Sequence, residues 1–152
     1  TSVLALAKQI HPKGTLTVIT AALNVSLELT HHPNVEVIQL GGMLRKSSSS
    51  TTGPYAEKVL DDFSCNKLFL GVDGIDIEFG LTTTNAMEAH LNRKMIAAAQ
   101  RTIVLADSSK FGKRGFGRIC GLEEVDQVIT DSGISDHMAD TLKGMGIELT
   151  IV

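Results

Sequence analysis

The sequence predicts an α/β fold, with a mostly parallel β-sheet flanked by helices. Short runs rich in Val, Ile and Thr alternate along the chain with helix-like segments, which is the order expected of right-handed β-α-β units. Hydrophobic residues make up 43% of the 152 residues, while aromatic residues make up only 4%. A core built mainly from aliphatic side chains suits buried parallel strands covered by helices.

The predicted strands are short and apolar, roughly four to six residues each, as expected of buried strands. They cover residues 15–20, 35–40, 67–72, 102–106, 127–130 and 147–152. The predicted helices cover residues 3–10, 22–31, 55–63, 86–100 and 136–144. Asn85 and Ser135 stand where N-caps are expected before the last two helices. All of these elements are expected to form a single domain, residues 1–152, with no internal boundary.

Two stretches interrupt this alternation. Residues 110–120 contain Gly112, Gly115 and Gly117, so we expect a loop or hairpin insertion there. Residues 47–52 read SSSSTT between two glycine-containing turns, and we expect them to form a solvated loop.

Composition and motifs exclude several classes of protein. The formal net charge is −3 and no long basic run is present, so this stretch is not expected to hold nucleic acid by itself. Cys65 and Cys120 are far apart and indicate free thiols in a reducing cytoplasm. No apolar run is long enough for a membrane span. The glycine motifs of dinucleotide-binding proteins, P-loop NTPases and α/β-hydrolases are missing, as is zinc-ligand spacing, so neither a cofactor nor a metal is expected.

Ligands of open parallel sheets bind at the carboxyl ends of the strands. Asp73 and Asp76 follow the predicted strand 67–72, and Gly74 between them permits a tight backbone path. Two carboxylates there can accept hydrogen bonds from sugar hydroxyls, take part in acid/base chemistry or hold Mg²⁺. An ordinary turn is the alternative. The segments Asp107-Ser108-Ser109-Lys110 and Asp131-Ser132-Gly133 follow other strands in the same way.

Hydroxyl groups lead into the long helix at residues 86–100. Thr82 and Thr83 come just before its cap, where hydroxyls and backbone N–H groups favour an anionic ligand. Glu88 is either part of the cap or a contact for a sugar hydroxyl. Lys110 is either a partner for a phosphate or carboxylate or a surface lysine.

Five stretches, taken together and in this order, resemble the C-terminal sensor domain of bacterial DeoR-family repressors. They are Gly41-Gly42-Met43-Leu44-Arg45, Gly53-Pro54-Tyr55-Ala56-Glu57, Gly71-Val72-Asp73-Gly74-Ile75-Asp76, Gly80-Leu81-Thr82-Thr83 with Glu88-Ala89, and Ala106-Asp107-Ser108-Ser109-Lys110-Phe111.

The resemblance implies a fold similar to ribose-5-phosphate isomerase and glucosamine-6-phosphate deaminase domains. It also implies a phosphorylated sugar as effector, a preceding helix-turn-helix domain that binds operator DNA, a homo-oligomeric cytoplasmic repressor, and an effector that changes operator affinity. The effector contacts expected on this basis are Thr20, Gly42, Arg45, Asp73, Gly74, Asp76, Thr82, Thr83, Glu88 and Lys110.

The chain departs from the family pattern at two places. The family usually has an Asp-x-Gly-Thr-Thr phosphate loop after its first sensor strand. Thr1 and Ser2 match only the tail of that loop, so we expect the first strand and most of the loop to precede Thr1, with Thr1 and Ser2 contacting the phosphate. The family also often has Thr-Asn after its second strand, whereas this chain has Thr20-Ala21.

Two alternatives to a sensor remain open. An isomerase-like enzyme on the same fold would use Asp73 or Asp76 for proton transfer, with Lys94 or Lys110 nearby. An oligomerisation domain with a vestigial pocket would bind no sugar phosphate.

Overall fold

The computed structural model describes residues 2–152. The chain divides into two compact units, Thr1–Asp62 and Phe63–Val152, and each has its own group of buried apolar side chains. The single sensing domain expected from the sequence stays a prediction. Thr1, one of the two predicted phosphate contacts, lies outside the described residues.

The first unit opens with a parallel β-α-β arrangement. Helix α1 (Ser2–Gln9) precedes β1 (Leu16–Thr20), α2 (Leu23–Leu29) and β2 (Val35–Gln39), and β1 pairs with β2 in parallel from Leu16↔Val35 to Thr20↔Gln39. Ala7, Val25 and Leu29 are buried between these elements, with Val18 and Val37 packed against them. The predicted strands and helices of this stretch are confirmed.

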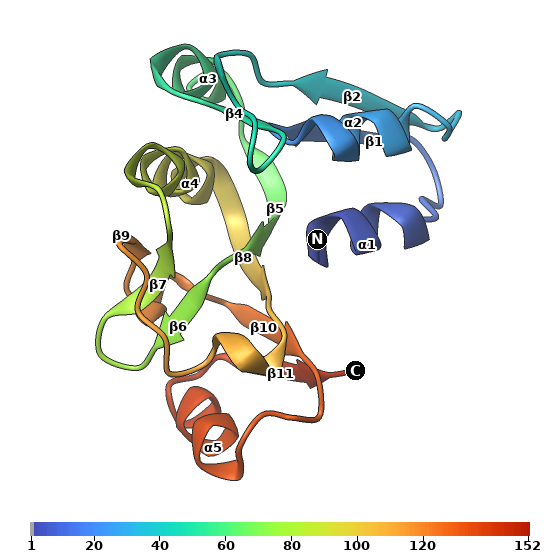
Figure 1. The fold of residues 1–152 in the computed structure, drawn as a ribbon. Coiled ribbons are helices and arrows are strands. Elements are labelled where there is room, and N and C mark those ends of the chain that lie inside the picture. Colours follow the sequence, from blue (N-terminus) through green and yellow to red (C-terminus); the bar gives the residue numbers. More distant parts are fainter. Residues whose placement is uncertain (1) are drawn as a thin grey trace. The chain divides into compact units, whose positions relative to one another are not determined.

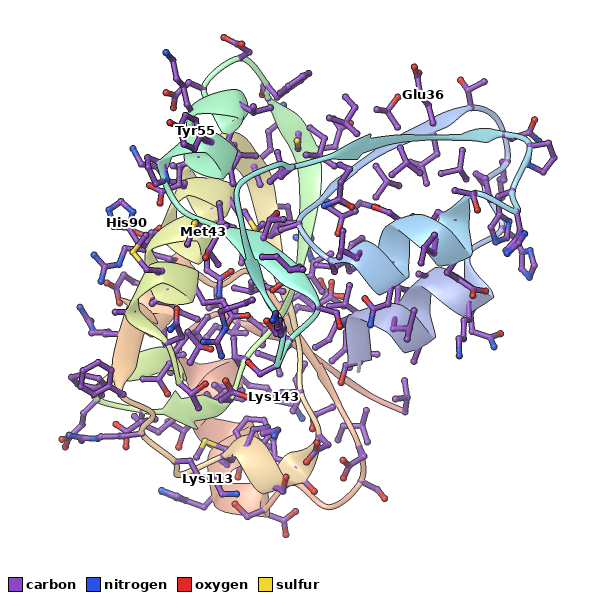
Figure 2. The ribbon with its side chains drawn as sticks, turned by 45° about the horizontal axis from the view of Figure 1, so that its top comes forward. Glu36, Met43, Tyr55, His90, Lys113 and Lys143 are labelled. Atoms are coloured by element: carbon purple, nitrogen blue, oxygen red, sulfur yellow. The ribbon has the colours of Figure 1, made fainter. Side chains whose placement is uncertain are left out.

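Only the first half of the polar tract is a solvated turn, and its second half is a hairpin strand, so the prediction of a solvated loop was wrong for residues 50–52. Strand β3 (Met43–Arg45) pairs antiparallel with β4 (Ser50–Thr52), and Thr51 and Thr52 are buried. The Thr51 hydroxyl donates to the Leu40 carbonyl oxygen at 2.6 Å, which satisfies a polar group that burial would otherwise make costly. Helix α3 (Pro54–Leu60) follows. Met43 and Tyr55, labelled in Figure 2, are exposed on this unit.

The second unit is built on a four-stranded parallel sheet, as predicted. Its strand order is β11 (Glu148–Ile151), β10 (Gln127–Thr130), β8 (Ala99–Leu105) and β5 (Cys65–Gly71), and every pairing is parallel. Helix α4 (Ala86–Ala98) packs on β8 and β5, and α5 (Asp136–Gly144) packs on β11 (Figure 1). The α/β class is therefore confirmed.

Both predicted helix caps are present. The Asn85 side chain accepts a hydrogen bond from the Glu88 N–H at 3.0 Å. The Ser135 hydroxyl accepts one from the Met138 N–H at 3.1 Å. Each cap satisfies a backbone donor that has no partner within its helix.

A second, antiparallel sheet was not predicted. It orders β6 (Gly74–Asp76), β7 (Gly80–Thr83) and β9 (Gly117–Cys120), and β9 occupies the end of the stretch predicted as a loop or hairpin. Two short 3₁₀ helices, η1 (Ser108–Lys110) and η2 (Leu122–Glu124), flank β9 in the chain. Ile75, Leu81 and Ile119 of this sheet are almost fully buried in the core of the second unit.

Candidate functional site

The parallel sheet brings three aspartates to one of its edges. Gly71 pairs with Leu105, and Leu105 pairs with Ile129, so the carboxyl ends of β5, β8 and β10 are neighbours. Asp73, Asp107 and Asp131 each stand two residues beyond these paired positions. This is the edge at which ligands of parallel sheets bind.

Asp73 presents an oriented and exposed carboxylate. Its Oδ2 accepts hydrogen bonds from the Thr83 hydroxyl at 2.8 Å and from the Thr84 N–H at 3.3 Å. Its backbone N–H donates to the Thr82 carbonyl oxygen at 3.0 Å. A carboxylate offers about four acceptor positions, so Asp73 retains capacity for sugar hydroxyls.

Asp76 has a different environment. Its Oδ1 accepts from the N–H groups of Glu78 and Phe79 at 2.9 and 2.7 Å, and its Oδ2 lies 3.0 Å from Arg114 Nε. The hydrogen bond from Arg114 and those from the two backbone groups hold the pKa of Asp76 below its ordinary value. The side chain is only 18% exposed, so Asp76 chiefly closes the turn between β6 and β7.

Gly74 and Thr82 are buried supports beneath this turn. A Cβ at Gly74 would lie 2.4 Å from the Lys113 carbonyl oxygen and 2.6 Å from Thr82 Oγ1. The Thr82 hydroxyl accepts a hydrogen bond from the Gly115 N–H at 2.7 Å, and its residue is fully buried. Both residues therefore contribute to the site through buried packing and not through an exposed side chain.

The ends of β8 and β10 are joined by side chains that the site prediction did not include. Asp131 accepts hydrogen bonds from the N–H groups of Ser108 and Gly133, each at 2.8 Å. Asp107 Oδ1 accepts from the Ser109 N–H at 2.9 Å. The hydroxyl and then the N–H of Ser109 lower the pKa of Asp107, and hydrogen bonds from Ser108 and Gly133 lower the pKa of Asp131. The signal that could have found them is the same strand-end position that singled out Asp73.

Lys110 and Glu88 lie in the same unit as the three aspartates. Lys110 ends η1 and is half-buried, and its ammonium group also helps to lower the pKa of Asp107. Glu88 is half-buried in the first turn of α4. Helix α4 packs on β7, the strand that carries Thr83.

The other predicted contacts belong to the first unit. The buried Thr20 hydroxyl accepts from the Ala22 N–H at 3.1 Å, at the end of β1. Gly42 has φ of 142°, and a Cβ there would lie 2.6 Å from the Thr52 carbonyl oxygen. Arg45 is half-buried on β3, and Ser2 begins α1. The β1 end and the β3–β4 hairpin are joined by the hydrogen bond from the Thr51 N–H to the Ala21 carbonyl oxygen.

Residues 1–132 match the protein family described as the DeoR C terminal sensor domain. The chain belongs to this family. The DeoR-type fold and the assignment to the repressor family, both expected from the sequence, are thereby confirmed.

Named relatives of this DeoR sensor domain are transcriptional regulators. The chain is 38% identical over 144 residues to the HTH-type transcriptional regulator YulB of Bacillus subtilis, covering 95% of this chain and 56% of that protein. It is 36% identical over 152 residues to a putative aga operon transcriptional repressor of Escherichia coli O157:H7, covering 100% of this chain and 56% of the relative. It is 34% identical over 151 residues to the transcriptional repressor GlcR of Bacillus subtilis, covering 99% of this chain and 58% of the relative. The chain thus spans little more than half the length of these relatives.

The described part of the DeoR domain has neither a membrane-spanning helix nor a metal-binding cluster. Within residues 2–152, every helix is too short or too polar to cross a membrane. The same residues contain no group of three or more His, Cys, Asp or Glu side chains arranged to hold a metal ion.

Proposed function

We propose that this chain is the effector-sensing part of a DNA-binding transcriptional repressor, and that its effector is a phosphorylated sugar. Family membership and the repressor names of the relatives support the regulatory role. The observation that carries the ligand proposal is the exposed Asp73 carboxylate, oriented by Thr83 and Thr84 at the carboxyl edge of the sheet.

The proposed sugar contacts follow from the geometry of the second unit. Asp73 accepts hydrogen bonds from the sugar hydroxyls, and Thr83 and Gly74 fix its position. Asp76 and Thr82 support the turn behind it. Glu88, on the helix packed against β7, offers a further acceptor for a hydroxyl group, and Lys110 offers a positive charge at an otherwise acidic edge.

For the first unit, taken by itself, the phosphate contacts predicted from the sequence are Thr1 and Ser2. Ser2 begins α1, whose first-turn N–H groups suit an anion, and Thr1 precedes it in the chain. Thr20, Gly42 and Arg45 complete the contacts proposed for the first unit.

The whole protein would be a homo-oligomer acting in the cytoplasm, with a helix-turn-helix domain that binds operator DNA. The relatives' names include HTH-type regulators, and the chain spans little more than half of their length. For the sugar phosphate to control DNA binding, it must bind two states of the repressor with different affinity.

A thermal-shift screen of the full-length protein tests this proposal. The panel pairs ribose 5-phosphate, glucose 6-phosphate and fructose 6-phosphate with the free sugars. We expect one phosphorylated sugar to raise the melting temperature in a concentration-dependent way, because it binds the native state alone. No rise across a wide panel, with the protein folded, would favour an oligomerisation domain with a vestigial pocket.

An isomerase-like enzyme is the less favoured reading. The relatives are named as regulators and repressors, and the Asp76 carboxylate is held by Arg114 and two N–H groups. Prolonged incubation with the same sugar phosphates, followed by NMR, should show no product.

A further inference from the structure

Arg114 fastens the loop between η1 and β9 to the turn of the β6–β7 hairpin. Its Nε lies 3.0 Å from Asp76 Oδ2, and its Nη2 lies 3.5 Å from Glu78 Oε2. Its guanidinium carbon lies 5.3 Å from the centre of the Phe79 ring, within reach of a cation–π interaction. The Asp76 side chain is 18% exposed and that of Glu78 is 88% exposed, so water screens the pair with Asp76 less.

Two backbone groups hold the same loop against the strands. The Gly112 N–H donates to the Ile75 carbonyl oxygen at 2.8 Å, and the Gly115 N–H donates to Thr82 Oγ1 at 2.7 Å. A Cβ at Gly115 would lie 2.9 Å from the Thr83 carbonyl oxygen, so the approach is close. Neighbouring Lys113 marks this loop in Figure 2.

The contacts continue from the loop to Asp73. The Thr82 carbonyl oxygen accepts from the Asp73 N–H at 3.0 Å, and the Thr83 hydroxyl donates to the Asp73 carboxylate at 2.8 Å. Arg114 is thus connected to Asp73 through the paired strands of the β6–β7 hairpin, with polar contacts at both ends.

We infer that Arg114 is a positioning residue for the proposed effector site, holding the β6–β7 hairpin, and through it the Asp73 carboxylate, in the orientation that binds sugar hydroxyls. The inference rests on the proposed function and adds a residue to it. Arg114 does not itself touch the sugar in this arrangement. It acts through Asp76, whose charged form is the better acceptor for the two N–H groups of the turn.

The charged groups around Asp76 make the inferred positioning role of Arg114 depend on pH. Arg114 faces Asp76 from the loop, Glu78 lies in the same turn, and Arg118 of β9 lies 5.6 Å from the centre of the Phe79 ring. The Arg114 hydrogen bond is the largest cause of the lowered pKa of Asp76. Without Arg114 that pKa rises toward its ordinary value, so Asp76 becomes protonated at a higher pH.

The test uses the full-length protein with Arg114→Gln, the conservative Arg114→Lys, and two controls. Lys113→Gln removes an exposed charge from the same loop without removing the Asp76 pair, and Glu78→Gln removes the more exposed partner of Arg114. Affinities for ribose 5-phosphate, glucose 6-phosphate and fructose 6-phosphate are measured from about pH 3 to about pH 7, a range that spans the ordinary pKa of an Asp carboxyl group.

We expect Arg114→Gln to weaken binding roughly ten-fold, equivalent to one decade in Kd, and to move the acid-side loss of affinity to a higher pH. Arg114→Lys should restore part of the affinity and part of the wild-type pH profile. The Kd of each control should stay within about two-fold of the wild-type value. Wild-type affinity and an unshifted pH profile in Arg114→Gln would overturn the inference.

Amide hydrogen exchange at Asp73 and Gly115 separates this inference from the proposed function. If the wild type binds none of the three sugar phosphates, the choice of effector fails, and the exchange data still decide the role of Arg114. We expect both amides to lose protection in Arg114→Gln, more so as the pH falls toward about 4. Unchanged protection of the Asp73 amide at every pH would contradict positioning by Arg114.

Discussion

The Thr83 hydroxyl donates a hydrogen bond to Asp73 Oδ2 at 2.8 Å, from a residue that is 4% exposed. Because the donor is buried and the acceptor is exposed, the hydroxyl fixes one oxygen of the carboxylate while the carboxylate faces solvent. Strand β7 therefore sets the orientation of the Asp73 carboxylate, the proposed contact for the effector.

Replacement of Thr83 by Val should weaken sugar-phosphate binding while the fold persists. Val matches the shape of Thr without its hydroxyl, and loss of a hydrogen bond to a charged group corresponds to roughly a ten-fold rise in Kd. Titration calorimetry checks this. Thr83→Ser should retain affinity, as should Thr84→Val, because Thr84 contributes its backbone N–H. Equal affinity in Thr83→Val and the wild type would show that this hydrogen bond does not orient the binding carboxylate.

Replacement of Gly74 by Ala should destabilise the second unit by about 1–3 kcal/mol, the usual cost of overpacking. The new Cβ would meet the Lys113 carbonyl oxygen at 2.4 Å, and a backbone atom cannot move aside as a flexible side chain can. Urea unfolding measures the change. Gly144→Ala is the matched control, since a Cβ there meets no atom within 4 Å. A Gly74→Ala protein as stable as the control would mean that the loop containing Lys113 moves aside at little cost in free energy.

The stability of the second unit should fall as the pH drops below about 4, in part through Asp131. Hydrogen bonds from Ser108, foremost its N–H, and from Gly133 lower the pKa of Asp131 in the folded state. The carboxylate therefore stabilises the fold above its ordinary pKa, and this contribution is lost as the pH falls through the lowered value. Free energies of unfolding at about pH 6 and about pH 3 should differ less in Asp131→Asn than in Asp140→Asn. An identical pH dependence in the two variants would exclude this role for Asp131.

Cys120 should react slowly with iodoacetamide at about pH 8, where a free cysteine is partly thiolate. Burial, together with nearby Glu124 and Glu123, raises the pKa of the Cys120 thiol to about 12. Mass spectrometry after timed alkylation reports each cysteine separately. Modification of Cys120 should be much slower in the native protein than in urea, and equal rates in the two conditions would show that the thiol is not protected.

The sequence predicted the parallel sheet and its helices because those elements carry aliphatic runs and recognisable caps. Strands β6, β7 and β9 were not predicted from the sequence, for a physical reason. They are three or four residues long, rich in Gly and Thr, and β7 takes its partner β9 from a distant part of the chain. Strands of this length carry too little periodicity, and their pairing is decided by tertiary contacts.

The sequence predicted that Asp73 and Asp76 follow a buried strand, but it did not predict their different surroundings. Asp73 and Asp76 look equivalent in sequence, yet one carboxylate is exposed and the other is held by Arg114. Only the folded loop brings Arg114 to Asp76, so spacing could not distinguish the two residues. In the same way, only the folded loop supplies the Gly115 N–H that donates to the buried Thr82 hydroxyl.

The decisive measurement is titration calorimetry of the full-length wild type, Asp73→Asn and Asp140→Asn against the sugar phosphate that gives the largest thermal shift. Asn keeps the size of Asp and removes its charge, and Asp140 is an exposed residue of α5. We expect the wild type and Asp140→Asn to bind alike, and Asp73→Asn to lose binding while melting cooperatively. Unchanged affinity in Asp73→Asn would contradict the assignment of the carboxyl edge of the parallel sheet as the effector site.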